Sequence, residues 1–153
     1  MPVPQFGEAG LEGPYPDRPA AFAVIERDGL IAVVEVERHG RGLVVDLPGG
    51  GIDPGETAGQ AAVRECGEEA GLVVRLETEP FARADHFFLH NDDAVRNTRG
   101  QFFAGKMLGE DPALHIEADH RLLWMAPDEA VRRLDRDSHC WALVTWLRLR
   151  ARA

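Results

Sequence analysis

The sequence predicts a single α/β domain, because strand-like apolar segments follow one another around a well-delimited helix and the composition is that of a globular protein. The chain has 153 residues, of which 44% are hydrophobic and 28% are charged, as is typical of soluble folded domains. A chain of this length buries roughly 68–70% of its unfolded surface in one core, so folding requires neither disulfides nor a structural metal.

Short apolar segments predict the strands of the sheet. Ala21–Glu26 and Leu30–Val36 flank Asp28-Gly29, a dipeptide that favours a β-hairpin turn. Leu43–Leu47 is expected to be a third strand, because it ends at a proline and three glycines. Further strands are expected at Val73–Phe81, Ala84–Leu89, Gln101–Leu108 and Leu122–Met125.

Three helices are expected from local end signals. Thr57 followed by Gln60 has the spacing of a capping box, and Gly71 favours a helix end, so a helix of about 13 residues should lie between them. The other two are a helix from Pro127 to about Leu134 and a last helix, capped by Ser138, with Trp141, Val144 and Leu147 on one side.

The first 17 residues are rich in proline and glycine, which predicts an N-terminal arm (residues 1–17) ahead of one domain (residues 18–153). The arm is either loose or packed against a second subunit, so a homodimer is left open. The N-terminus has no basic stretch followed by an apolar one, and a cleaved secretion signal is not expected. Two cysteines, Cys66 and Cys140, are too few for a disulfide framework and suit a reducing cytoplasm.

The charge of the chain argues against two classes of partner. Lys and Arg number 17 against 26 Asp and Glu, a formal net charge of −9, whereas broad nucleic-acid or membrane binders present a basic face. The longest apolar run, Ala20–Ile25, has six residues, and a membrane-spanning helix needs about 20. We therefore expect no nucleic-acid and no membrane partner, and a phosphate ligand would need a bridging cation.

The first expected helix carries three glutamates, Glu65, Glu68 and Glu69, within an arc of about 100°. Like-charge pairs at these spacings cost about 0.2–0.5 kcal/mol each, and the helix dipole disfavours anions near a helix C-terminus. The face is either an ordinary solvated acidic surface or a site for a divalent cation, which prefers carboxylate oxygens. The residues expected to anchor the opposite side are Val63, Cys66 and Ala70.

The residues before this helix favour the cation site. The run Gly49-Gly50-Gly51 follows a strand and allows a close approach of the backbone, so that its carbonyl oxygens can serve as further ligands. Glu56, just before the helix cap, is within reach of Arg64 about two turns further on.

The stretch Gly50–Leu72 resembles the Nudix box, G-x5-E-x7-R-E-U-x-E-E-x-G-U, in which U is a bulky apolar residue. The matching fixed positions are Gly50, Glu56, Arg64, Glu65, Glu68, Glu69, Gly71 and Leu72. Cys66 occupies the first U position, where Ile, Leu or Val is usual, and only a packing consequence is expected. Gly67, in a variable position, lowers helix propensity by about 1 kcal/mol relative to alanine.

This resemblance implies an α/β/α sandwich around a mixed β-sheet, and hydrolysis of a nucleoside diphosphate linked to another group with Mg²⁺ or Mn²⁺ bound. It implies that Glu65, Glu68 and Glu69 are the catalytic, metal-binding carboxylates, with the Gly49 carbonyl as an additional ligand. In MutT-like members the glutamate that matches Glu65 has been assigned as the base that activates water. A structural role in the site is implied for Gly50, Glu56, Arg64 and Gly71.

Family members often add one acidic group from outside the box. Glu117 and Asp119 are the candidates in the loop before the last strand, with Glu110 as a further one. The alternative is a merely polar loop. His120, next to them, is more often structural in such a setting, although a role in the substrate cleft stays open.

Other patterns are weaker. Gly100–Lys106 approaches a phosphate-binding P-loop, but the next residue is methionine where the motif needs Ser or Thr. His86 and His90 are expected to be polar residues of the surface or the substrate cleft rather than a metal pair. Trp124 and Trp141 are expected in the core.

The substrate is the least determined feature. Subgroups that hydrolyse ADP-ribose or dinucleoside polyphosphates carry a proline or a tyrosine downstream of the box, where this chain has Phe87 and Leu89. This difference favours a MutT-like nucleoside triphosphate pyrophosphohydrolase or an unassigned sugar-nucleotide substrate. The alternative to an enzyme is a nucleotide-sensing module with the same fold and no turnover, although such modules usually lose box carboxylates.

Overall fold

The computed structural model describes residues 2–10 and 13–153; Met1 and residues 11–12 of the predicted arm lie outside the described residues. None of the helices in these ranges is both long and apolar enough to cross a membrane. The strands are β1 (Gln5–Phe6), β2 (Asp17–Arg27), β3 (Leu30–Arg38), β4 (Gly42–Asp46), β5 (Gly49–Gly51), β6 (Leu72–Leu76), β7 (Ala82–Leu89), β8 (Val95–Glu110) and β9 (Arg121–Met125). The helices are α1 (Ala58–Ala70), α2 (Pro127–Arg133) and α3 (Asp137–Ala151), with a 3-10 turn η1 (Pro112–Leu114).

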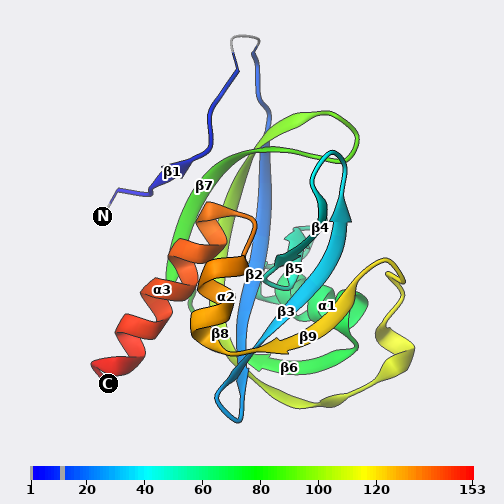
Figure 1. The fold of residues 1–153 in the computed structure, drawn as a ribbon, viewed down its shortest axis with the longest axis vertical. Coiled ribbons are helices and arrows are strands. Elements are labelled where there is room, and N and C mark those ends of the chain that lie inside the picture. Colours follow the sequence, from blue (N-terminus) through cyan, green and yellow to red (C-terminus); the bar gives the residue numbers. More distant parts are fainter. Residues whose placement is uncertain (1, 11–12) are drawn as a thin grey trace.

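One mixed sheet runs through the molecule (Figure 1). Its main path is β1-β7-β8-β2-β3-β4, while β5, β6 and β9 pair with β2, β8 and β3 respectively. The pairs β2 with β8 and β1 with β7 are parallel, and the others are antiparallel. The sheet is therefore mixed, as the resemblance implied.

The central strand β2 is buried on both faces. Phe22 and Val24 pack in one cluster with Leu143 of α3, whereas Ala23 and Ile25 pack in another with Cys66 of α1. Because successive side chains of a strand point to opposite faces, α1 and α3 cover opposite sides of the sheet. Figure 1 shows α2 and α3 together on one side and α1 on the other. The expected α/β/α sandwich is confirmed.

The bounds of β8 and β6 differ most from those expected. β8 begins at Val95 rather than at Gln101, because its first part pairs with both β7 and β2. β6 stops at Leu76 rather than at Phe81, since the following segment contains Pro80, which has no N–H to offer to a neighbouring strand.

Part of the predicted arm lies against the sheet. β1 pairs with β7, with Gln5 opposite Asp85 and Phe6 opposite His86. The Phe6 ring centroid lies 6.0 Å from that of Trp141 in α3. This short strand therefore extends the sheet at β7, and the homodimer stays a prediction.

Ser138 does not cap α3, contrary to expectation. The N-cap residue is Arg136, without a side-chain cap, and the Ser138 hydroxyl lies 2.8 Å from His86 Nδ1 in the interior. The predicted apolar face is also wrong at Val144, which is 38% exposed, whereas Leu143 is fully buried. The helix is thus rotated relative to the expected face.

Candidate active site

The predicted local signals set the ends of α1. Thr57 Oγ1 accepts the Gln60 N–H at 3.1 Å, and Gln60 Oε1 accepts the Thr57 N–H at 2.9 Å, which is a complete capping box. Gly71 ends the helix in the left-handed conformation, with a φ of 65°. Gly67 faces Leu114, since a Cβ there would lie 3.3 Å from Leu114 Cδ1.

Arg64 and Glu56 form the pair expected from the sequence. Arg64 Nε donates to Glu56 Oε2 at 2.8 Å, and Arg64 Nη2 donates to Oε1 at 2.9 Å. The same guanidinium donates at 3.0 Å to the Gly51 carbonyl, to Glu65 and to Glu68. Hydrogen bonds from Arg64 lower the pKa of Glu56 to about 2, and Glu56 raises the pKa of Arg64. Arg64 thus ties the preceding loop and β5 to the glutamates of α1.

Two of the three glutamates of α1 lie on the same buried side of the helix as Cys66, and not on the opposite side as expected. Glu65 and Glu69 are 9% and 7% exposed, on the same side as Cys66. Val63, expected to anchor the helix, is instead 39% exposed. The glycines of β5 leave room for the carboxylates, since a Cβ on Gly50 would lie 2.8 Å from Glu65 Oε1.

Burial gives Glu65 an unusual ionisation. It raises the pKa of the carboxyl to about 7; repulsion from Glu69 adds to the rise, and the hydrogen bond from Arg64 opposes it. A carboxyl with a pKa near neutral can accept and release a proton under physiological conditions. The electrostatics of Glu65 therefore suit the role of base that the resemblance implies.

Glu69 is held at both of its oxygens. Oε1 accepts the Gly49 N–H at 2.8 Å, and Oε2 lies 3.0 Å from His120 Nε2. Gly49 has a φ of 151°, and a Cβ there would lie 2.3 Å from the Ala21 carbonyl oxygen. Only glycine fits at this position. Its N–H contacts a site carboxylate, and ligation by its carbonyl stays a prediction.

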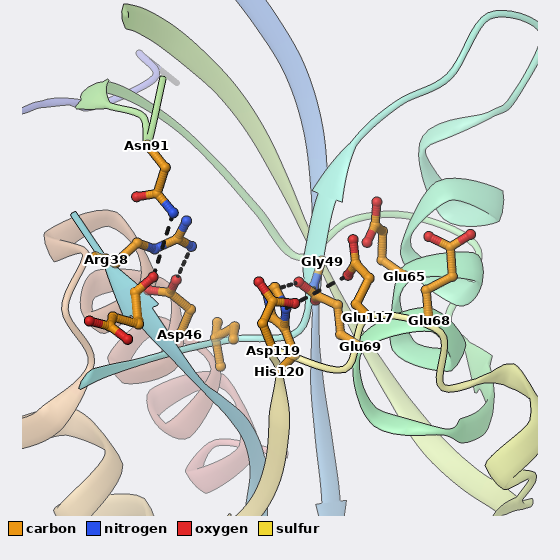
Figure 2. A network of polar contacts seen from close by, with 12 residues as sticks. Arg38, Asp46, Gly49, Glu65, Glu68, Glu69, Asn91, Glu117, Asp119 and His120 are labelled. Carbon is orange, nitrogen blue, oxygen red and sulfur yellow. Dashed lines mark hydrogen bonds and ion pairs between the residues drawn. The ribbon is translucent and has the colours of Figure 1, made fainter. Parts of the chain in front are cut away.

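Glu117 is the acid from outside α1 that joins the glutamates (Figure 2). Its N–H donates to the Glu68 carbonyl at 3.0 Å, which fastens the loop before β9 to the helix. Figure 2 shows its side chain between Glu69 and the other two glutamates. The candidate that sequence reasoning named for this loop therefore lies at the centre of the cluster.

Asp119 approaches the cluster through His120. His120 Nδ1 lies 2.9 Å from Asp119 Oδ1, and the Asp119 side chain is 75% exposed. The hydrogen bond to Glu69, with a smaller contribution from Asp119, raises the pKa of His120 to about 9 against the effect of burial. Glu110, the third candidate, ends β8 and lies 3.6 Å from Arg27, so it is not part of this loop.

The donor set fits a divalent cation. Ligand atoms of Glu65, Glu68 and Glu117 lie within 4.8 Å of one another, as do those of Glu69, Glu117 and His120. Glu117 Oε2 is buried and has no hydrogen-bond partner among residues 2–10 and 13–153. A buried carboxylate oxygen without a partner is costly, and Mg²⁺ or Mn²⁺ would satisfy it.

A second polar cluster lies across from the glutamates in Figure 2, and the sequence did not predict it. Arg38 of β3 pairs with Asp46 of β4, and Arg136 Nε lies 3.7 Å from Asp46 Oδ1. Arg136 is buried 3.9 Å from the centroid of the Phe88 ring, and burial lowers its pKa to about 10. Only the tertiary structure brings these positions together, so no spacing in the sequence could have revealed them.

The weaker sequence patterns are structural. Phe102 is buried within β8, which leaves no flexible P-loop there. His86 is buried rather than at the surface, and His90 is partly buried. Trp141 packs against the core as expected, and Trp124 packs under the guanidinium of Arg27, 4.3 Å from its carbon.

Comparison with known proteins agrees with this arrangement. The family model described as the NUDIX domain matches residues 16–147. The putative mutator protein MutT4 of Mycobacterium tuberculosis is 31% identical over 131 residues, 72% of this chain, which spans about half (52%) of MutT4. An RNA pyrophosphohydrolase of Sphingopyxis alaskensis is 31% identical over 116 residues, which cover 69% of this chain and 73% of that protein.

Solved structures share the fold. A MutT NUDIX hydrolase from Burkholderia pseudomallei superposes with a TM-score of 0.63 at 26% identity, covering 84% of this chain and 97% of that one. A NUDIX hydrolase from Nitrosomonas europaea gives a TM-score of 0.73 at 22% identity, with coverage of 85% and 88%. Since the family model spans most of the chain and the relatives exceed 30% identity, the chain belongs to the NUDIX domain family.

Proposed function

We propose that this protein is a metal-dependent Nudix hydrolase that cleaves a pyrophosphate bond in a nucleoside diphosphate linked to another group. The observation that carries the proposal is the convergence of Glu65, Glu68 and Glu69 of α1 with Glu117 from a separate loop. Like charges gathered in this way oppose folding. A bound divalent cation, and through it a substrate phosphate, would neutralise the repulsion between these carboxylates.

Each residue of the site has its own role in the proposed hydrolysis. Glu65, Glu68 and Glu117, with Glu69 beside them, would hold a divalent cation, which would supply positive charge for the phosphate oxygens and lower the pKa of a bound water. Glu65 accepts the proton as water adds to phosphorus, and the bridging P–O bond breaks with the leaving phosphate taking the electron pair. Arg64 holds Glu65 and Glu68 in place, and the Gly49 N–H holds Glu69.

Positive charge for the rest of the substrate comes from arginines. The negative charge of Glu69 acts to raise the pKa of both Arg18 and Arg136, against the effect of their burial, so both arginines lie within electrostatic range of the cluster, although the protein as a whole is strongly acidic. We expect these arginines to attract the part of an anionic substrate that the cation does not cover.

We propose a nucleotide-like small molecule as the substrate and the cytoplasm as the location. The relatives in the comparison include an RNA pyrophosphohydrolase, but a net charge of −9 disfavours a long polyanion. RNA ends therefore belong in the test as a competing class.

The decisive experiment measures phosphate and nucleotide release with Mg²⁺ or Mn²⁺ from nucleoside triphosphates, oxidised nucleotides, ADP-ribose, dinucleoside polyphosphates, sugar nucleotides and a 5′-triphosphorylated RNA oligonucleotide. Turnover of one class, lost in Glu68→Gln and Glu69→Gln but kept in the matched surface variant Glu110→Gln, is the expected result. Full activity in both box variants would overturn the roles assigned here. Metal-dependent nucleotide binding without any product would identify a sensor instead.

A further inference from the structure

His120 enters the carboxylate cluster from the loop between η1 and β9. The His120 N–H donates to the Glu117 carbonyl at 3.0 Å, so the two residues share one tight turn. The imidazole is 12% exposed, and its Nε2 lies 3.0 Å from Glu69 Oε2. One aromatic nitrogen therefore faces the same space as the carboxylates.

We propose that His120 is a nitrogen ligand of the divalent cation, bound through Nε2, and that Asp119 is the residue that orients its ring. The inference rests on the proposed metal-dependent function and goes beyond it, since the box supplies oxygen ligands only. The site then consists of Glu69, Glu117 and His120, next to the oxygen-only group of Glu65, Glu68 and Glu117.

The distances fit shared coordination. Two neighbouring ligand atoms of an octahedral ion bound at about 2.1 Å lie about 3.0 Å apart. His120 Nε2 and Glu69 Oε2 have this separation, 3.0 Å, and ligand atoms of Glu117 complete a set within 4.8 Å. Glu117 Oε2 has no hydrogen-bond partner in the described part of the chain, which leaves it available to a cation.

The surroundings of the ring fit the same role. A metal-ligating histidine almost always donates its other ring N–H to a carboxylate, a carbonyl or a water. His120 Nδ1 lies 2.9 Å from Asp119 Oδ1, which leaves Nε2 as the ligating nitrogen. His120 gives up its Nε2 proton on binding the ion, because ligation requires the neutral imidazole.

A ligand set with one imidazole has a consequence for metal preference. Mg²⁺ favours oxygen ligands. Mn²⁺ accepts an imidazole ligand more readily than Mg²⁺ does, although less readily than Co²⁺ or Zn²⁺. We expect the affinity for Mn²⁺ to depend on His120 more strongly than the affinity for Mg²⁺.

Pulsed electron paramagnetic resonance of Mn²⁺ bound to the full-length protein, in a nitrogen-free buffer, tests the assignment directly. Modulation from a coordinated ¹⁴N nucleus is expected in the unaltered protein, with a changed pattern after uniform ¹⁵N labelling. It should disappear in His120→Gln and persist in the matched control His39→Gln, whose side chain is 68% exposed. Absence of the modulation in the unaltered protein, or its persistence in His120→Gln, would overturn the proposal even if the variant folded poorly.

Metal titrations separate this inference from the proposed function. His120→Gln and Asp119→Asn should each weaken Mn²⁺ binding by about 10–100-fold, with the nitrogen signal kept only in Asp119→Asn. If Mn²⁺ binds and supports hydrolysis without a nitrogen signal, the proposed function stands and the His120 assignment fails. If Mn²⁺ does not bind at all, both fail.

Discussion

Replacing Gly50 with alanine should displace the carboxylate of Glu65, the proposed base, without straining the backbone. Gly50 is absent from the glycines with positive φ, so its backbone accepts an L-residue. The new Cβ would lie 2.8 Å from Glu65 Oε1 and 2.9 Å from Glu65 Cδ. Ordinary contacts begin near 3.4 Å, so the carboxylate and the new Cβ have to separate by about 0.6 Å. The carboxylate should move more readily than β5, because pairing with β2 holds the strand in place.

The expected effect is on rate rather than on folding. A misplacement of about 1 Å at a catalytic group can cost on the order of 100-fold, so kcat should fall by roughly 10–100-fold, which is about 1.4–2.7 kcal/mol in the activation free energy. The free energy of unfolding should change by less than about 1 kcal/mol, as is usual when a flexible side chain can move aside.

Initial rates on whichever compound of the substrate panel is hydrolysed, together with urea unfolding, measure both effects. Gly109→Ala is the matched control, since its Cβ would meet no atom within 4 Å. Gly49→Ala is the opposite control and should lose several kcal/mol of stability, because a Cβ there would lie 2.3 Å from the Ala21 carbonyl oxygen. Unchanged kcat in Gly50→Ala would refute the idea that the bare backbone of β5 fixes the position of Glu65.

Three further predictions concern α1 and the titration of the site. Gly67→Ala should raise the free energy of unfolding by about 0.5–1 kcal/mol, because alanine has the higher helix propensity. Leu114 is 42% exposed and can turn away from the new methyl group. A lower free energy of unfolding in urea titrations would mean that Leu114 cannot move. Arg64→Lys should reduce kcat at least about 10-fold, since lysine cannot hold Glu56 in a two-point contact, and kinetics equal to those of the unaltered protein would exclude a positioning role. In metal-free protein, the raised pKa values of Glu65 (about 7) and His120 (about 9) mean that the folded state holds extra protons, so their stabilisation is present at low pH and lost as pH rises through these values. Denaturant titrations in EDTA should show that the free energy of unfolding falls by roughly 3 kcal/mol between pH 6.5 and 9.5, and that most of this fall is absent in His120→Gln. A free energy of unfolding that does not change over this range would contradict the raised pKa of His120.

The ends of α1 could be predicted from the sequence because they depend on neighbours. Thr57, Gln60 and Gly71 act over one helical turn, and the structure confirms all three. The anchoring face was wrong at Val63 because burial depends on what the sheet presents. The small side chains and bare backbone opposite α1 admit carboxylates where an apolar face was expected, and periodicity alone cannot reveal such an opening.

The site residues outside α1 were harder to predict from the sequence, because their contacts depend on the tertiary structure. Glu117 was among several candidate acids, and it is the folded loop, with the contact between its N–H and the Glu68 carbonyl, that places it rather than Asp119 among the glutamates. Arg136 was not predicted, because its partner Asp46 is distant in sequence and meets it only after the sheet has closed. Long-range pairs of this kind leave no local pattern.

The long strand β8 links the site to the order in which the molecule folds. β8 has 16 residues and pairs with β7, β2 and β6, and its parallel register joins Asp17 to Asn97 and Glu26 to Lys106. The paired residues of β2 and β8 are far apart in the sequence, so closing the loop between them costs entropy before the pairing can stabilise it. Chains rich in such long-range pairs fold in milliseconds to seconds. On the ribosome α1 is made well before β8 and the loop that follows it. We therefore expect the slow closing of the sheet to be the step that also brings Glu117 and His120 to α1, so that activity appears together with the last stage of folding.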